Sequence, residues 1–202
     1  MRRGKGRVSA QRDAVPLNAQ KKALREVYLQ RRRAITSAQK QTLDAQIVSR
    51  VLRSGAYRTA QTVLCYLPMA HEVDVTPILL DAWRSGKRVA APRCRPHGQM
   101  DFFTIRDMQD LSRGAWGISE PNADRPLCVP DEASLCIVPA LAADAEGYRL
   151  GHGGGYYDRY FAAHPVRKLG VCYAFCVSPA LPREPFDIPI DLWITDVYPK
   201  EV

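Results

Sequence analysis

The chain has 202 residues, of which 46% are hydrophobic and 25% charged, so it can bury one substantial core. Its first residues are charged, and no apolar run approaches the ~18 residues of a membrane span, which argues against a leader or anchor and predicts a cytoplasmic protein. The six cysteines form no Cys-x-x-Cys pair, so we expect buried free thiols instead of disulfides or a zinc site.

The formal net charge of +8 is unevenly distributed along the chain. Residues 1–33 contain eleven Lys or Arg against Asp13 and Glu26, whereas residues 34–202 contain eighteen basic and nineteen acidic residues. Residues 1–17 have few large apolar side chains, so we expect a disordered basic extension there and a single domain over residues 18–202. The basic segment suits either an arm that binds nucleic acid or the capture of a polyanionic small molecule.

The first helix is expected from Asn18, a good N-cap residue, to Ala34. Lys21 and Arg25 lie four residues apart and therefore on one helix face, where they can clamp one anion. The alternative for these two residues is an ordinary solvated basic face.

The remaining elements alternate between helices and strands. A capping box at Thr36-x-x-Gln39 opens a helix that we expect to stop at Gly55, and Asp74 is the expected cap of a helix that stops at Gly86. Apolar runs predict strands at 62–67, 88–92, 100–105, 134–139, 168–175 and 192–195, and residues 111–121 are expected to be irregular. This order predicts an α/β fold of three layers, a mostly parallel central sheet with helices on both faces, and two N-terminal helices before the first strand.

The most informative stretch is Arg149-Leu-Gly-His-Gly-Gly-Gly-Tyr-Tyr-Asp-Arg-Tyr160. Its glycines can adopt positive φ, and we expect such a position at Gly154. The following aromatic residues form one stripe of a helix that Pro165 ends. Unpaired N–H groups of a glycine loop and of a helix N-terminus favour phosphate, and Arg149 and Arg159 add positive charge on either side.

Two better-known phosphate loops do not match this stretch. A Walker A loop requires Gly-Lys-Ser/Thr after its spacer, whereas these glycines run into Tyr-Tyr-Asp. The dinucleotide fingerprint Gly-x-Gly-x-x-Gly fails because its third glycine position falls on Tyr156 or Asp158. A tight turn without a ligand remains the alternative.

The same stretch resembles the C-terminal signature of the 5-formyltetrahydrofolate cyclo-ligase family. Three other places agree with this resemblance, which covers most of residues 20–198: Lys21-x-x-Leu24-Arg25, Tyr66-Leu67-Pro68 with Glu72, and Trp116-Gly117-Ile118-x-x-Pro121. The resemblance implies an enzyme that uses ATP and Mg²⁺ to close 5-formyltetrahydrofolate into 5,10-methenyltetrahydrofolate, with release of ADP and phosphate. Its implied route is transfer of the γ-phosphoryl group to the formyl oxygen, which activates a poor electrophile for attack by N10.

Matched residue by residue, the resemblance implies three groups of site residues. ATP binding would involve Lys21, Arg25, Arg149, Leu150, Gly151, His152, Gly153, Gly154, Gly155, Tyr156 and Tyr157. Folate binding would involve Leu67, Glu72, Trp116, His152, Gly153, Gly154, Gly155 and Tyr156, and metal binding Asp158 and Asp191. His152 departs from the Tyr or Arg of many family members.

Several of these residues also have a purely structural explanation. Glu72 would then be a surface carboxylate, Trp116 a core residue, and Asp158 a partner of the helix dipole. At the level of function, the alternatives are nucleic-acid binding through the N-terminal segment and another α/β enzyme that acts on a sugar phosphate or a CoA ester. We expect a monomer without a nucleic-acid or membrane partner.

Overall fold

The structure is a computed structural model that describes residues 15–114 and 117–197. The predicted N-terminal extension lies outside the described residues as far as position 14, and Leu17 already belongs to the first helix. Among the described residues, no helix combines the length and the apolar character that crossing a membrane requires.

In the described part of the chain, three helices precede the first strand, where the sequence predicts two: α1 (Leu17–Arg33), α2 (Ser37–Arg53) and α3 (Gly55–Thr59). α1 begins earlier than expected, with Pro16 instead of Asn18 at the N-cap. The capping box at the start of α2 is confirmed. α2 ends at Arg53 with Ser54 as its C-cap, in agreement with the expected stop at Gly55. The hydroxyl of Ser54 also accepts the N–H of Tyr57 and caps a further short helix, which begins at Gly55 and was not expected.

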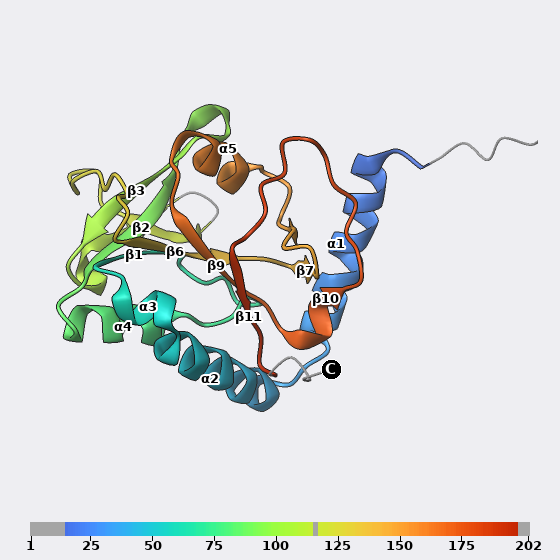
Figure 1. Cartoon of the computed structure of the whole chain (residues 1–202), viewed down its shortest axis with the longest axis horizontal. Coiled ribbons are helices and arrows are strands. Elements are labelled where there is room, and N and C mark those ends of the chain that lie inside the picture. Colours follow the sequence, from blue (N-terminus) through green and yellow to red (C-terminus); the bar gives the residue numbers. More distant parts are fainter. Residues whose placement is uncertain (1–14, 115–116, 198–202) are drawn as a thin grey trace, which may run out of the picture.

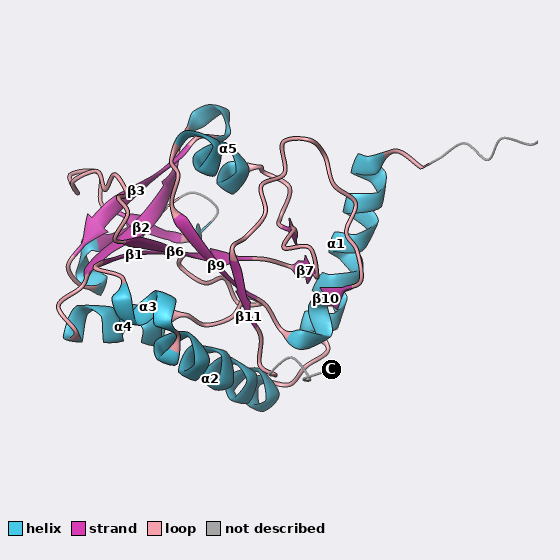
Figure 2. Cartoon of the chain, viewed as in Figure 1, coloured by secondary structure: helices cyan, strands magenta, loops and turns pink. Residues whose placement is uncertain are grey.

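A six-stranded sheet has the order β11-β9-β6-β1-β2-β3. Its strands are β1 (Thr62–Cys65), β2 (Arg88–Cys94), β3 (Met100–Ile105), β6 (Ser134–Pro139), β9 (Arg167–Val171) and β11 (Leu192–Ile194). All neighbouring pairs are parallel except β2 and β3, which form an antiparallel hairpin. The predicted α/β fold with a mostly parallel sheet is therefore confirmed (Figures 1 and 2).

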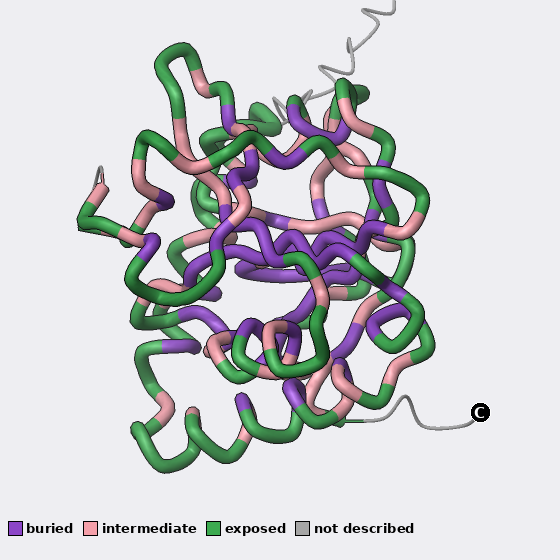
Figure 3. The backbone as a smooth tube through the Cα atoms, turned by 90° about the vertical axis from the view of Figure 1, so that its left-hand side faces the viewer, coloured by how far each residue is buried: buried purple, intermediate pink, exposed green. Residues whose placement is uncertain are grey.

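Alternation along the strands divides the core into two layers. In β1, Val63 and Cys65 pack into the cluster that includes α2, α3 and α4 (Thr76–Arg84), whereas Leu64 packs into the cluster that includes α5 (Tyr156–Ala163). The predicted helices on both faces are thus present, and buried positions concentrate along the central strands (Figure 3). α4 begins with Val75 at its N-cap, and Asp74 accepts the N–H of Thr76 from one position further out.

Several short elements were not expected from the sequence. They are β4 (Leu111–Arg113), β5 (Ser119–Pro121), β7 (Ala142–Asp144), β8 (Arg149–Leu150) and β10 (Val177–Ser178). β4 and β5 form an antiparallel hairpin in the region expected to be irregular, and β7 is the centre of a three-stranded sheet with β10 and β8. Strands of two or three residues are too short for an alternating pattern, so their pairing depends on tertiary contacts.

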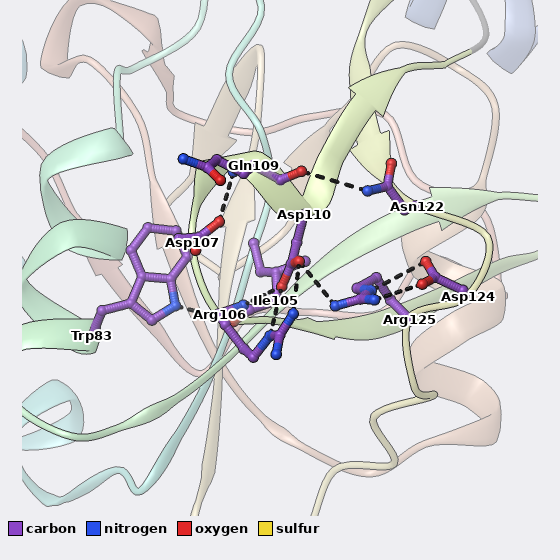
Figure 4. Close-up of polar contacts among 9 residues, drawn as sticks. All are labelled: Trp83, Ile105, Arg106, Asp107, Gln109, Asp110, Asn122, Asp124 and Arg125. Atoms are coloured by element: carbon purple, nitrogen blue, oxygen red, sulfur yellow. Dashed lines mark hydrogen bonds and ion pairs between the residues drawn. The ribbon is translucent and has the colours of Figure 1, made fainter.

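A buried carboxylate secures the connection between β3 and β4. Asp110, which is 7% exposed, accepts hydrogen bonds from the backbone N–H and the guanidinium of Arg106 and from Nη1 of Arg125 (Figure 4). The Arg106 hydrogen bonds, together with the charge of Arg125, hold the pKa of Asp110 below its ordinary value. This network fixes the base of the β4–β5 hairpin.

The sequence predicts that the cysteines are buried free thiols, and the structure agrees for most of them. All six are free thiols, five of them are buried, and Cys94 is half-buried.

Candidate active site

The glycine loop connects β8 to α5. Gly153 has φ +98° and Gly155, the N-cap of α5, has φ +64°. The expected left-handed position at Gly154 is wrong, and a different constraint applies there, because a Cβ on Gly154 would lie 2.6 Å from Cε2 of Tyr156. Residues 152–154 are exposed, so an anion can reach this part of the loop, directly before the N-terminus of α5.

Arg25 of α1 lies against this loop. Its Nε donates a hydrogen bond of 2.9 Å to the carbonyl of Gly151. Its guanidinium carbon lies 3.1 Å from the place where a Cβ on Gly153 would stand. Because Gly153 has no side chain, the guanidinium of Arg25 can lie directly beside the loop.

Lys21 lies one turn before Arg25 on α1 and is nearly buried. Its ammonium contacts Asp187 at 2.6 Å and Glu184 at 2.8 Å, both from the segment that precedes β11. The structure thus brings Arg25 to the glycine loop and pairs Lys21 with two carboxylates, so the alternative of an ordinary solvated basic face is wrong for both.

Arg149 and Asp158 form an ion pair of 2.9 Å at the start of α5, and the Arg149 side chain is only 5% exposed. The backbone of Ile188 joins them, since its N–H donates to Oδ1 of Asp158 and its carbonyl accepts from Nη1 of Arg149. Arg149 therefore holds Asp158 and the segment before β11 together. Its contacts are internal, which differs from the phosphate contact that the sequence predicts.

Tyr157 places an unpaired hydroxyl in the same region. Its hydroxyl oxygen is buried and has no hydrogen-bond partner among the described residues. Burial raises the pKa of Tyr157 well above its ordinary value, so the hydroxyl keeps its proton. A buried hydroxyl without a partner is costly, and a polar ligand or a water would satisfy it.

Glu72 faces the glycine loop from the exit of β1. It is 6% exposed, its Oε2 accepts the N–H of Met69, and its Oε1 lies 3.2 Å from Nε2 of His152. Because Glu72 is buried, the alternative that it is an ordinary surface carboxylate is wrong. The parallel strands end at this edge of the sheet, where ligands of open α/β sheets commonly bind.

A sequence model of the 5-formyltetrahydrofolate cyclo-ligase family matches residues 17–196. The chain belongs to the 5-formyltetrahydrofolate cyclo-ligase family. The 5-formyltetrahydrofolate cyclo-ligase of Escherichia coli K12 is 33% identical over 172 residues, which cover 82% of this chain and 94% of the relative. The mouse 5-formyltetrahydrofolate cyclo-ligase is 26% identical over 194 residues, which cover 88% and 94%.

Solved structures agree with the family assignment. The 5,10-methenyltetrahydrofolate synthetase of Aquifex aeolicus matches with a TM-score of 0.76 and 30% identity, over 87% of this chain and 89% of that one. The synthetase of Mycoplasma pneumoniae matches with a TM-score of 0.71 and 25% identity, over 88% and 99%. The α/β fold is therefore that of the cyclo-ligases, and this family member is an ATP-dependent ligase.

Two further residues, Leu67 and Trp116, are predicted to bind folate. Leu67 is 8% exposed and packs into the core cluster beside α2 to α4. Trp116 lies outside the described residues. Their roles in this family member stay predictions.

The predicted metal ligands are Asp158 and Asp191, and they differ in whether a carboxylate oxygen is left to bind a cation. The contacts of Asp158 with described residues all use Oδ1, which leaves Oδ2 for a metal. Both oxygens of Asp191 contact Lys168, at 2.7 Å from its backbone N and 3.0 Å from Nζ. Among residues 15–114 and 117–197, no group of three or more His, Cys, Asp or Glu side chains is arranged to hold a metal ion. Magnesium often binds one or two carboxylates together with phosphate oxygens and water, so Asp158 fits such a role, whereas Asp191 would first have to release Lys168.

Sequence reasoning missed the role of Arg32, which is 3% exposed at the end of α1. Its guanidinium donates to the carbonyls of His71, Ala140 and Leu141, in the segments that follow β1 and β6. Arg32 thereby joins α1, the helix that also carries Lys21 and Arg25, to the carboxyl edge of the sheet. Its position within Arg31-Arg32-Arg33 gave no signal of burial.

Proposed function

We propose that this chain closes 5-formyltetrahydrofolate into 5,10-methenyltetrahydrofolate with ATP as the second substrate, and that ADP and phosphate leave. The observation that supports this most is the exposed glycine loop at the N-terminus of α5, with the guanidinium of Arg25 against it. Backbone N–H groups, a helix dipole and a cation at one place favour phosphate.

The reaction requires such a place. The formyl group on N5 is an amide, so its carbon is a poor electrophile until the γ-phosphoryl group of ATP has been transferred to the formyl oxygen. N10 then attacks that carbon and loses its proton, and the C–O bond to phosphate breaks. Positioning and charge neutralisation are the main work of a protein in phosphoryl transfer.

In our proposal, different residues of the site position the substrates and neutralise charge. Lys21 and Arg25 contact the ATP phosphates together with the loop at 151–155, and Arg149 holds Asp158 at the start of α5. Tyr157 directs its unpaired hydroxyl at a ligand. Glu72 and His152 form the wall that folate contacts, and we include Leu67, Trp116 and Tyr156 as predicted contacts.

Magnesium completes the proposed site. Bound by Asp158, Mg²⁺ would neutralise charge on the phosphates, and Asp191 is the predicted second ligand. We also infer a cytoplasmic monomer without a nucleic-acid partner, as the sequence predicts.

The test is an absorbance assay for the methenyl product with 5-formyltetrahydrofolate, ATP and Mg²⁺, each omitted in turn. We expect product only when all three are present. Product without ATP, or no product in the complete mixture while a sugar phosphate or a CoA ester is consumed, would reject the proposal.

A further inference from the structure

Two carboxylates enclose the ammonium group of Lys21. Its Nζ lies 2.6 Å from Oδ2 of Asp187 and 2.8 Å from Oε2 of Glu184, and Lys21 is only 8% exposed. The segment that carries both carboxylates runs beside α1 before it enters β11 (Figure 1). A lysine side chain has many rotamers, and two charge-assisted hydrogen bonds restrict it to one direction.

The carboxylates are held in place by their own backbone as well as by Lys21. Oδ2 of Asp187 accepts the N–H of Glu184 at 2.8 Å, and the N–H of Asp187 donates to the carbonyl of Glu184 at 3.0 Å. These bonds close a turn over residues 184–187. The turn therefore presents both carboxylates to Lys21 as one unit.

This turn is connected to the glycine loop on two sides. On α1, Arg25 follows Lys21 by one helical turn and binds the carbonyl of Gly151. On the other side, Ile188 follows Asp187 directly and binds both Asp158 and Arg149. The direction of the Lys21 side chain is thus fixed relative to the candidate phosphate site.

The number of donors leaves Lys21 able to bind a ligand. An ammonium group has three N–H donors, and the carboxylates use two of them. The ring of Phe186 also lies over Nζ, with its centroid at 5.9 Å, so the third donor has an aromatic face nearby and no carboxylate. Burial alone would lower the pKa of Lys21, but the hydrogen bonds to Asp187 and Glu184 outweigh burial and raise it. Lys21 therefore stays charged, with one N–H that no carboxylate uses.

We propose that Glu184 and Asp187 are positioning residues that hold Lys21 for contact with the phosphates of ATP. The inference rests on the proposed function. A lysine–carboxylate pair has the same task in protein kinases, where it must be in place for phosphoryl transfer. The alternative is competition, in which the two carboxylates keep Lys21 away from phosphate, and it predicts the opposite change in the KM for ATP.

The test compares the steady-state kinetics of wild type, Asp187→Asn, Glu184→Gln, Lys21→Met and the double variant Lys21→Met/Asp187→Asn. We expect Asp187→Asn to raise the KM for ATP by about threefold to tenfold, because the acceptor of the hydrogen bond from Lys21 loses its charge, and to leave the KM for 5-formyltetrahydrofolate nearly unchanged. In the Lys21→Met background, Asp187→Asn should have little further effect, because its role is exerted through Lys21.

Glu146→Gln is the matched control. It weakens the ion pair of Glu146 with Arg183, at 2.6 and 2.7 Å, which lies on the residue before Glu184 and does not include Lys21. We expect it to leave the KM for ATP unchanged. Asn at position 187 retains an oxygen for the N–H of Glu184. If Asp187→Asn nevertheless fails to fold, Glu184→Gln carries the same prediction, because the turn uses only the backbone of Glu184.

The outcomes separate the inference from the proposed function. A lower or unchanged KM for ATP in the carboxylate variants, or an equal effect of Asp187→Asn with and without Lys21, would overturn the positioning role while wild-type turnover stands. Wild type without turnover would overturn the proposed function and the positioning role together.

Discussion

The glycines of the loop at 151–155 are not interchangeable, because a side chain would meet a different obstacle at each position. A Cβ at Gly151 has open space, one at Gly154 overlaps the ring of Tyr156, and ones at Gly153 and Gly155 approach arginine side chains at positive φ. Two of the four glycines are thus required by backbone conformation, and a third is required by a close ring.

Gly153→Ala should damage ATP binding more than folding. A Cβ at its left-handed φ costs ~1 to 2 kcal/mol, and the same atom pushes the guanidinium of Arg25 away from the loop. We expect the KM for ATP to rise roughly tenfold, with a melting temperature only a few degrees lower. Gly55→Ala is the control, since it has open space and no positive φ. A large fall in melting temperature with an unchanged KM would assign Gly153 to folding alone.

Asp158→Asn tests the metal site and should also lower stability. The asparagine keeps an acceptor for the N–H of Ile188 but removes the charge that faces the nearly buried Arg149, at a cost of about 1 to 3 kcal/mol. The magnesium concentration for half-maximal turnover should rise. Asp191→Asn is the comparison, because Asp191 is bound to Lys168 in this structure. If only Asp191→Asn shifts the magnesium titration, Asp158 has a structural role.

At the scale of elements, the sequence predicts a helix or strand correctly where its residue pattern extends over several residues. The apolar run of β6 and the capping box of α2 predict those elements, and the glycines followed by aromatic residues predict α5. β7, β8 and β10 could not be predicted, because two or three residues carry no period.

The same limit applies to the candidate site, because only those of its features that are local in the sequence could be predicted. The run of glycines and the spacing of Lys21 and Arg25 are local features, so they are visible in the sequence. The partners of Lys21 lie 163 and 166 residues away, and pairing over that distance depends on the finished fold. Glycine identity also permits positive φ without specifying where it occurs, which is why Gly154 was assigned wrongly.

The Asp110 network should make the attachment of the β4–β5 hairpin sensitive to acid. The pKa of Asp110 is lower in the folded protein than in the unfolded chain, so its stabilisation is present above a pH of about 4 and is lost as the pH falls through the folded pKa. The difference in melting temperature between wild type and Asp110→Asn should be largest near neutral pH and should shrink in acid. Glu132→Gln, an exposed carboxylate, should show no such trend. A difference that is constant with pH would mean that Asp110 contributes by shape and hydrogen bonding, without its charge.

At the scale of the whole molecule, the basic N-terminal segment divides into two parts. Within α1, Lys21, Arg25 and Arg32 are used for contacts inside the protein. Residues 1–14 contain five further Lys or Arg against Asp13. Lys22, Arg31 and Arg33 of α1 are exposed, so these three and the five cations of residues 1–14 are open to a role in nucleic-acid binding.

Deletion of residues 1–14 should therefore separate the enzyme from the nucleic-acid alternative. The cut leaves Val15 and Pro16, whose carbonyls accept from the side chain and the backbone of Gln20 at the start of α1, so the helix keeps its first turn. We expect turnover and melting temperature to stay close to wild type, while any retention on DNA that decreases with salt becomes weaker because five cations are removed. A cut after residue 17 would remove the first residue of α1 and is not equivalent. If the shorter protein folds but loses turnover, the first fourteen residues take part in catalysis, and the division of charge between tail and helix is wrong.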